Sequence, residues 1–348
     1  MRLLSLLYFP LFLLAQEPMQ TRTQILMGTF VTVTLPQKDS HRITGAFARI
    51  KEIENALSSY DTHASLSKLN KDHHVYADPY LTEAISLSRA YYDETNGYFD
   101  ITIGSISKDL YHFGEEKTYS PSKKALQNAA LNIDGINIED TQIKSDENIT
   151  IDLGGMGKGY GVDKVAGYLK DQNVTEGIIA LSGDIRCLNT CEILLQSPYN
   201  EHTFARIKSK NSDLSISTSG TYRRYANTKE EHHLINPKTA SQGKEFVSVS
   251  LFSRADNAKI DAYATALAVM PKDEALAFLK THKDIAFVLV DTKGKILYGN
   301  ITDLLTLEWL GYSEKASMPS MSKKSTRNSE SKTSLIHPDT SNPKLISR

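Results

Sequence analysis

Ile151-Asp152-Leu153-Gly154-Gly155-Met156-Gly157-Lys158-Gly159-Tyr160-Gly161 is a glycine-rich stretch that joins two different kinds of sequence. Before it, the first three residues are predicted to end a β-strand, and after it residues 162–169 have the pattern of a helix. Glycines at such a junction let the backbone approach a ligand closely, and the helix that follows presents free N–H groups to an anion. The stretch therefore indicates either a site for a phosphate-bearing ligand, with Lys158 as a counter-charge, or a tight structural turn.

Two familiar nucleotide-binding patterns do not fit this stretch. The Walker pattern needs Ser or Thr after Gly-Lys, but Gly159 follows Lys158. The dinucleotide pattern G-x-G-x-x-G needs glycine where Tyr160 or Val162 stands. The glycines alone therefore do not identify the ligand.

Strands and helices are predicted on both sides of this stretch without a regular alternation. Strand patterns cover residues 30–35, 178–181, 193–195, 214–217, 247–252 and 286–290, and helix patterns cover residues 44–57, 82–92, 121–128 and 259–270. Thr82 is predicted to cap the second helix, and Pro121 to lie in the first turn of the third. This order favours an α+β fold of mixed sheets flanked by helices over a doubly wound sheet.

The composition of the 348 residues is that of a globular protein, with 40% hydrophobic and 23% charged residues. It excludes collagen-like, wholly disordered and multi-span membrane proteins. The net charge of −1 gives no support for a nucleic-acid partner. Arg2 gives the first 15 residues +1 and the last 36 residues carry +4, so residues 16–312 carry −1 − 1 − 4 = −6.

The two ends differ from the middle of the chain. Residues 1–15 combine Arg2 with a short apolar run and a small residue, which predicts a secretory signal peptide. Residues 313–348 are rich in Ser and Lys and predict a disordered tail. We therefore expect an exported protein of the periplasm, free or membrane-associated, whose functional domain spans residues 16–312.

Cys187 and Cys191 are the only cysteines. Their surroundings look like two strands joined by a short turn. In an oxidising compartment they could form a disulfide across that hairpin, and otherwise they would be two reduced thiols. Two cysteines without a nearby histidine do not make a zinc site.

Asp261 and Thr265 lie four residues apart in the predicted helix of residues 259–270, so they share one helical face. A carboxylate beside a hydroxyl suits a hard cation such as Mg²⁺, although both side chains could also simply face water. His232 and His233 follow a segment rich in hydroxyls and arginines. Adjacent strand residues point to opposite faces, so only one histidine is expected to serve as a proton acceptor; the alternative is that neither has a role.

Taken in order, eight short segments resemble the ApbE family, the FAD:protein FMN transferases, between about Met27 and Met270. They are Met27-Gly28-Thr29, Ser59-Tyr60 with Leu69-Asn70, Gly97-Tyr98-Phe99-Asp100-Ile101-Thr102, Asp152 to Gly159, Ser182-Gly183-Asp184-Ile185, Ser219-Gly220, His233-Leu234-Ile235-Asn236-Pro237 and Asp261-Ala262-Tyr263-Ala264-Thr265. Each is unspecific by itself, but their shared order is specific. The resemblance implies an ApbE-like fold and a flavin transferase.

The resemblance also implies a role for individual residues. Mg²⁺ would be held by the side chains of Asp261 and Thr265 and by backbone oxygens of Gly155 and Ala264. His233 would be the catalytic proton acceptor, with Asp261 as the second catalytic residue. FAD, the substrate, would contact Met27, Tyr60, Tyr98, Phe99, Asp100, Asp152, Lys158 and Ile235.

The implied reaction moves the FMN half of FAD to a threonine hydroxyl of an acceptor protein, a membrane-associated or periplasmic redox protein, and releases AMP. The chain departs from the family pattern at Ser182, at Thr221 and at Asn236 with Ala240. These departures bear on acceptor choice and metal affinity. Two alternatives stay open: an FAD pyrophosphatase, with water in place of threonine, and a non-catalytic flavin-binding protein.

Overall fold

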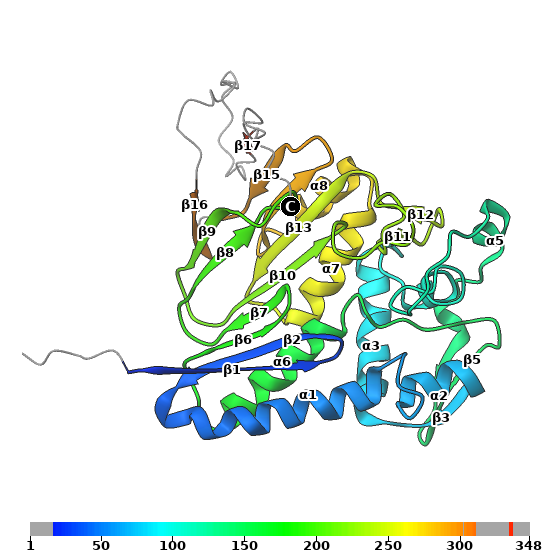
Figure 1. Cartoon of the computed structure of the whole chain (residues 1–348), viewed down its shortest axis with the longest axis horizontal. Coiled ribbons are helices and arrows are strands. Elements are labelled where there is room, and N and C mark those ends of the chain that lie inside the picture. The colour runs from blue at the N-terminus through cyan, green and yellow to red at the C-terminus, as the bar shows by residue number, and fades with distance from the viewer. Residues whose placement is uncertain (1–16, 302, 311–333, 337–348) are drawn as a thin grey trace, which may run out of the picture.

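The computed structural model describes residues 17–301, 303–310 and 334–336 (Figure 1). The predicted signal peptide lies outside the described residues, and so does the predicted tail except for residues 334–336. Within the described ranges, no helix combines the length and the apolar character needed to cross a bilayer.

A nine-stranded sheet forms the centre of the molecule, in the order β1-β2-β6-β7-β10-β13-β14-β15-β17, with antiparallel neighbours throughout. Its strands are β1 (Met19–Leu26), β2 (Thr29–Pro36), β6 (Ile178–Leu181), β7 (Asp184–Cys187), β10 (Leu214–Gly220), β13 (Phe246–Ser253), β14 (Ala286–Asp291), β15 (Ile296–Gly299) and β17 (Ser334–Ile336). Three smaller sheets comprise β3 (His74–Tyr76), β4 (Ile136–Ile138) and β5 (Gln142–Ser145), then β8 (Glu192–Gln196), β9 (Thr203–Ser209) and β16 (Leu305–Trp309), and the pair β11 (Ile235–Asn236) and β12 (Ser241–Gln242).

The helices gather on one side of the central sheet (Figure 1). They are α1 (Ile43–Leu57), α2 (Ser65–Asp72), α3 (Pro79–Glu94), α4 (Gly104–Ser107), α5 (Lys123–Asn128), α6 (Gly157–Asp171), α7 (Asn257–Val269) and α8 (Lys272–Thr281), with short 3₁₀ turns η1 (Gln37–Arg42), η2 (Ile101–Ile103) and η3 (Ile133–Gly135). Together with these sheets, whose described strand pairs are antiparallel rather than mixed, they make the predicted α+β fold.

Hydrophobic side chains on both faces of the central sheet explain this layering. On β2, Val31, Val33 and Leu35 are fully buried and pack with residues of α1 and α6. On the other face, residues such as Ile216 and Val288 pack with Ile207 of the β8–β9–β16 sheet. Both faces of the central strands are therefore covered, one by helices and the other by the smaller sheet. This agrees with the burial of every residue of β14.

Several predicted elements need correction at their starts. Helix α6 begins at Gly157 rather than at residue 162, so the last five residues of the glycine-rich stretch are helical. Residues 151–153 form no strand. Instead, the side-chain amide of Asn70 donates to the carbonyl of Ile151 at 2.9 Å and accepts its N–H at 2.8 Å, as a neighbouring strand would.

Two helix starts are also displaced. Asp78, not Thr82, caps α3, because its carboxylate accepts from the N–H groups of Tyr80 and Leu81. Ser122 caps α5 by accepting from the N–H of Ala125, which leaves Pro121 before the helix rather than in its first turn.

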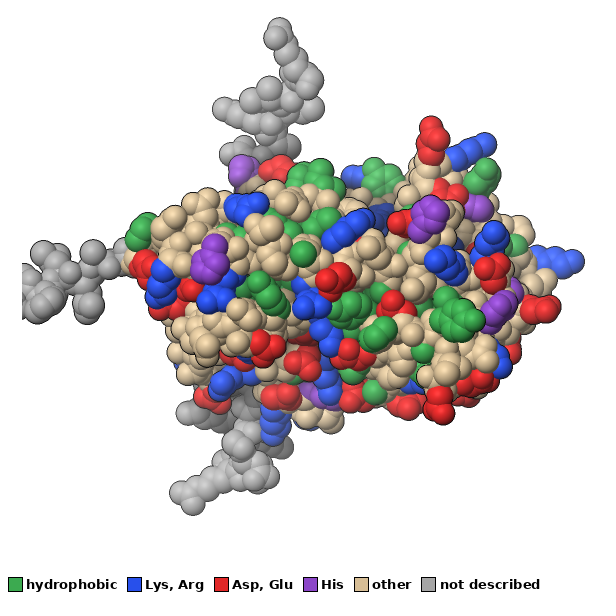
Figure 2. Space-filling view, turned by 90° about the horizontal axis from the view of Figure 1, so that it is seen from below, with side chains coloured by type: hydrophobic (Ala, Val, Ile, Leu, Met, Phe, Trp, Pro, Cys, Tyr) green, Lys and Arg blue, Asp and Glu red, His purple; other side chains and the backbone are tan. Residues whose placement is uncertain are grey.

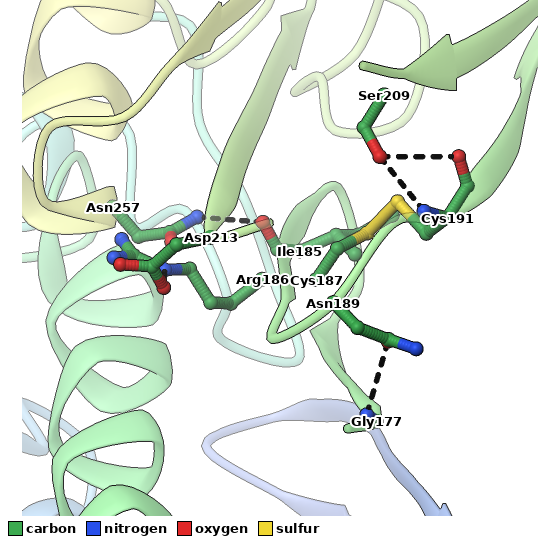
Figure 3. The surroundings of a disulfide bond; sticks show 9 residues. All are labelled: Gly177, Ile185, Arg186, Cys187, Asn189, Cys191, Ser209, Asp213 and Asn257. Atoms are coloured by element: carbon green, nitrogen blue, oxygen red, sulfur yellow. Dashed lines mark hydrogen bonds and ion pairs between the residues drawn. A yellow bond between two sulfur atoms is a disulfide. The ribbon is translucent and has the colours of Figure 1, made fainter. Parts of the chain in front are cut away.

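Cys187 and Cys191 form a disulfide, but not across a hairpin (Figure 3). Cys187 ends β7, which pairs with β6 and β10, whereas β8 begins after Cys191 and pairs with β9. The disulfide therefore joins the central sheet to the smaller sheet that covers it. The predicted strand pair was wrong because the strands after Cys191 turn onto the other layer.

The face of the molecule seen from below carries basic and acidic side chains interleaved with hydrophobic ones, with acidic side chains along one edge (Figure 2). On this side the charge is mixed rather than gathered in one patch of a single sign.

We expect the Cys187→Ala/Cys191→Ala double variant to fold and to lose about 2 kcal/mol of unfolding free energy, because the sequence separation of 4 closes only a short loop. Urea unfolding of the oxidised wild type and the variant measures the difference. Reduced wild-type protein should match the variant. A loss well below 1 kcal/mol would mean that the layers constrain this loop without the disulfide.

Candidate active site

Three charged side chains from three elements meet at the start of α6. Lys158 Nζ lies 2.9 Å from Asp184 Oδ2 of β7 and 3.3 Å from Asp261 Oδ2 of α7. The N–H of Gly159 donates to the same Asp261 oxygen at 3.1 Å. Both carboxylates are almost fully buried, at 1% and 3% side-chain exposure, while Lys158 is 31% exposed. One lysine thus faces two buried carboxylates.

The electrostatics of this cluster are unbalanced toward negative charge. Burial, followed by the neighbouring Asp184, raises the pKa of Asp261 above its usual range. Burial would lower the pKa of Lys158, but the two carboxylates outweigh it and hold that pKa above the usual value. One further positive charge at this place would relieve the repulsion between the carboxylates.

Neutral oxygen atoms lie in the same region as these carboxylates, since Thr265 lies one helical turn after Asp261 on α7. Thr265 Oγ1 donates to the carbonyl of Gly155 at 3.2 Å and lies 3.5 Å from Ser219 Oγ. Ser217 Oγ donates to Asp184 Oδ1 at 2.6 Å. Asp184 Oδ2 is buried and accepts no hydrogen bond of good geometry from the described residues, despite the nearby ammonium group.

These oxygens fit a hard cation, which prefers carboxylate, hydroxyl and carbonyl ligands. Among the residues that the structure describes, no group of three or more His, Cys, Asp and Glu side chains could hold a metal. A cation here would therefore depend on the neutral oxygens as well as on the carboxylates. Ala264 lies inside α7, so its carbonyl oxygen would share any such role with the helical hydrogen bond.

A second charged group lies around Asp152, just before the glycines. Its Oδ2 accepts from Ser107 Oγ at 2.7 Å and lies 3.8 Å from Lys108 Nζ. Burial would raise the pKa of Asp152, but Lys108, Ser107 and the N–H of Gly154 together lower it. Lys108 also donates to the hydroxyl of Tyr60, whose ring is half exposed.

The two histidines face different surroundings, as expected. His232 is buried, and its Nε2 donates to the carbonyl of Gly243 at 3.0 Å. Nδ1 of His233 lies 3.1 Å from the carbonyl oxygen of Arg224. Because a carbonyl can only accept, Nδ1 carries the proton and Nε2 is left as the basic nitrogen. Burial and the Arg224 charge lower the pKa of His233 to about 4, so the ring is neutral at pH 7.

The remaining predicted flavin contacts are spread around this region. The Met27 side chain lies against the first turns of α6, near Gly157 and Gly161. Phe99 is buried beside Gly155, whereas the ring of Tyr98 has Lys238 Nζ 3.9 Å from its centroid.

Two further predicted flavin contacts, Asp100 and Ile235, have their side chains engaged by other residues of the protein. Asp100 accepts from the N–H and hydroxyl of Thr102, which caps a 3₁₀ turn. Ile235 is buried with Tyr111 and Phe113. Their contacts with FAD stay predictions.

Four residues of this region have contacts that the sequence did not predict. Asp184 and Ser219 stand in quoted segments, so the signal was present, but only the fold shows that they face Asp261 and Thr265. Arg224 stands in the segment rich in hydroxyls and arginines, but only the fold shows that it contacts His233. Lys108 gave no signal, because single basic residues are common on protein surfaces. Their significance comes from the carboxylate and the histidine that they contact.

The fold and the site define an α+β protein in which buried carboxylates, a lysine and hydroxyls meet at the start of a glycine-rich helix, an arrangement suited to a cation that could pair with an anionic ligand. The ApbE family model matches residues 27–289, so the chain belongs to the ApbE family.

Curated relatives and solved structures agree with that membership. The chain is 27% identical to the FAD:protein FMN transferase of Vibrio cholerae, over 76% of this chain and 86% of the relative, and 25% identical to that of Haemophilus influenzae, over 75% and 81%. The flavin transferase ApbE structure from Vibrio cholerae superposes with a TM-score of 0.70 at 21% identity, covering 85% of this chain and 98% of that one. The ApbE protein of Thermotoga maritima gives 0.71 at 22% identity, over 80% and 96%.

We expect the imidazole of His233 to titrate near pH 4 in the folded protein. NMR titration of histidine-labelled protein measures this, and His233→Gln assigns the signal by its loss. A titration near the ordinary value of about 6.5 would contradict the assignment.

The same pKa shift predicts a pH dependence of stability. Because the unfolded chain takes up the His233 proton at a higher pH than the folded chain, this stability is present above about pH 6.5 and is lost as the pH falls toward 4. From pH 7 to pH 5 the wild type should lose about 1–2 kcal/mol more unfolding free energy than His233→Gln. Equal losses in urea unfolding would contradict it.

Proposed function

We propose that this protein transfers the FMN part of FAD to a threonine hydroxyl of an acceptor protein, with Mg²⁺ as the cation and AMP as the second product. That the chain is a flavin-transferring enzyme follows from the matching family model and from relatives named FAD:protein FMN transferase. The proposal for the cation and the transfer step rests on the cluster of Asp184, Lys158 and Asp261, with 2.9 and 3.3 Å between the ammonium and the carboxylates.

Phosphoryl transfer depends on positioning and on the neutralisation of phosphate charge. Mg²⁺ held by Asp261, Thr265 and the Gly155 carbonyl would supply positive charge to the FAD pyrophosphate. Lys158, which already lies beside both carboxylates, would orient the same group. Its 31% exposure leaves the ammonium accessible to a ligand.

The neutral ring of His233 supports a role as general base. Its Nδ1–H is directed to the Arg224 carbonyl, which fixes the ring and leaves Nε2 to accept a proton. In the reaction the threonine oxygen bonds to the FMN phosphorus, its proton passes to His233, and the bond from that phosphorus to the bridging pyrophosphate oxygen breaks. AMP leaves with that oxygen, so atoms and charge balance.

We also infer that the protein is exported to the periplasm. The Cys187–Cys191 disulfide supports an oxidising compartment, in agreement with the predicted signal peptide. Cell fractionation followed by mass spectrometry of the mature N-terminus tests this, and full-length protein in the cytoplasm would contradict it.

Incubation with FAD, Mg²⁺ and a threonine-bearing acceptor domain should yield one covalently flavinylated acceptor for each AMP released. Intact-protein mass spectrometry and nucleotide chromatography measure the two products. The matched control is the acceptor with its target threonine changed to alanine. FMN and AMP without labelling would instead identify a pyrophosphatase.

We expect Asp261→Ala to reduce the rate of flavin transfer by about 10²–10³-fold even at saturating Mg²⁺, because the buried carboxylate at the cation site is lost. Asp273→Ala removes an exposed carboxylate from α8 and should leave the rate unchanged. Substantial residual activity of the Asp261 variant would show that Asp261 is not needed to hold Mg²⁺.

His233→Ala should lower kcat by about 10²-fold while FAD affinity stays within a few-fold of wild type, since the ring acts on the acceptor proton. Initial rates and FAD fluorescence titration separate the two quantities. Parallel losses in both would make His233 a cofactor-positioning residue instead.

A further inference from the structure

The N-terminus of α7 lies one helical turn before Asp261 and is held by a buried polar network. Asp256, the residue at the cap position, makes no side-chain capping bond. The carboxylate of Asp163, on α6, caps the helix instead, because its two oxygens accept from the N–H groups of Asn257 and Ala258, both at 2.8 Å. The cap therefore ties α7 to the helix that carries Lys158.

Arg186 connects this cap to the central sheet, and Figure 3 draws its side chain together with Asp213. Its side chain is 6% exposed, and its Nη1 lies 3.7 Å from Asp163 Oδ1 and donates to the carbonyl of Ala255 at 3.1 Å. Its Nε donates to Asp213 Oδ1 at 2.8 Å, and the guanidinium also donates to the hydroxyl of Ser215. Arg186 lies on β7, two residues after Asp184.

Asn257 completes the network between β7 and β10. Its fully buried side-chain NH₂ group donates to the carbonyl of Ile185 at 2.9 Å (Figure 3). The same group donates to the carbonyl of Ile216 at 3.1 Å, and these two residues are the last pair in the β7–β10 ladder. The next residues along the two strands are Asp184 and Ser217, which bond to each other. The network thus lies directly beside the cluster of Lys158, Asp184 and Asp261.

We propose that Asp163, Arg186 and Asn257 are positioning residues for the flavin-transfer reaction. They fix α7 against α6 and β7, and so fix the separation of Asp261 from Lys158 and Asp184. Asn257, Asp261 and Thr265 follow one another at intervals of four residues on one helical face, so a shift of the α7 N-terminus moves both predicted cation ligands together. This proposal rests on the proposed function.

The close crossing of the helices makes the arrangement sensitive to small shifts. A Cβ at residue 159 would lie 2.4 Å from the carbonyl oxygen of Asn257, so only glycine lets α6 approach α7 this closely. Gly159 also donates its N–H to Asp261. A change of about 1 Å at the Asp163 cap is therefore transmitted to the catalytic carboxylate.

The test uses Asp163→Asn, which keeps the shape of the side chain but replaces one accepting oxygen with an NH₂ donor. We expect kcat to fall about tenfold and the half-saturating Mg²⁺ concentration to rise about tenfold, with the KM for FAD within twofold of wild type. The Mg²⁺-induced rise in Tm, measured with FAD and without acceptor, should shrink accordingly. Asp171→Asn, an exposed position on α6, is the matched control and should behave as wild type.

Arg186→Lys provides a second variant if Asp163→Asn folds poorly, since it keeps the charge but not the guanidinium geometry. It should show the same pattern to a lesser degree. A lower Tm with unchanged kcat and Mg²⁺ dependence per folded molecule would overturn the proposal, because it would show a purely structural role.

The proposed function and the positioning proposal can fail independently, and the Mg²⁺ dependence of the wild-type enzyme is measured first to tell them apart. If wild-type transfer needs no Mg²⁺, the cation assignment is wrong, and the positioning proposal is then judged by kcat against the KM for FAD. A kcat loss at unchanged KM would still support it, and no kcat loss would overturn it.

Discussion

The contact of Lys158 with both Asp184 and Asp261 is the interaction on which the rest of the site depends. Two carboxylates with 1% and 3% exposure cannot remain charged without partners, because burial in a region of low dielectric constant is costly. A single ammonium reaches both only if α6, β7 and α7 come together at one point. The fold can therefore be understood as the means of bringing these elements within that reach.

The glycines allow the close approach of α6 to α7, in addition to any contact that they make with a ligand. Gly159 lies inside α6, where glycine disfavours the helix by about 1 kcal/mol relative to alanine, yet a Cβ there would overlap the backbone of Asn257. The sequence pattern therefore predicted a loop where tertiary packing imposes a helix. Another tertiary contact explains why residues 151–153 need no neighbouring strand. The side-chain amide of Asn70, on α2, forms the hydrogen bonds that the backbone of Ile151 needs.

Local patterns predicted the α+β class, the strands β2, β6, β8, β10, β13 and β14, and the helix that carries Asp261 and Thr265, because hydrophobic periodicity can be read from the sequence itself. The strands β1, β3–β5, β9, β11, β12 and β15–β17 were not predicted. The role of Asp184 was not predictable locally, since its partners lie 26 and 77 residues away and only the sheet order places them together. The sequence left the state of Cys187 and Cys191 undecided for the same reason. A disulfide was plausible, but long-range packing decides to which layer β8 belongs. The cap of α3 was misplaced because Asp78 and Thr82, one helical turn apart, are both good capping residues.

The pairing of charges at the site bears directly on the ligand it can take. Lys158 is paired with two carboxylates and Lys108 lies 3.8 Å from Asp152, so neither lysine brings a net positive charge to a pyrophosphate. Residues 16–312 carry −6 overall, which opposes an anionic ligand further. A dinucleotide therefore needs another cation between its phosphates and these carboxylates, and the hydroxyls of Thr265 and Ser219 with the carbonyl of Gly155 supply neutral oxygens that would not repel it. A cation bound there would offset the negative charge of residues 16–312, and the positioning that we propose for the network at the start of α7 would then determine how well it is held.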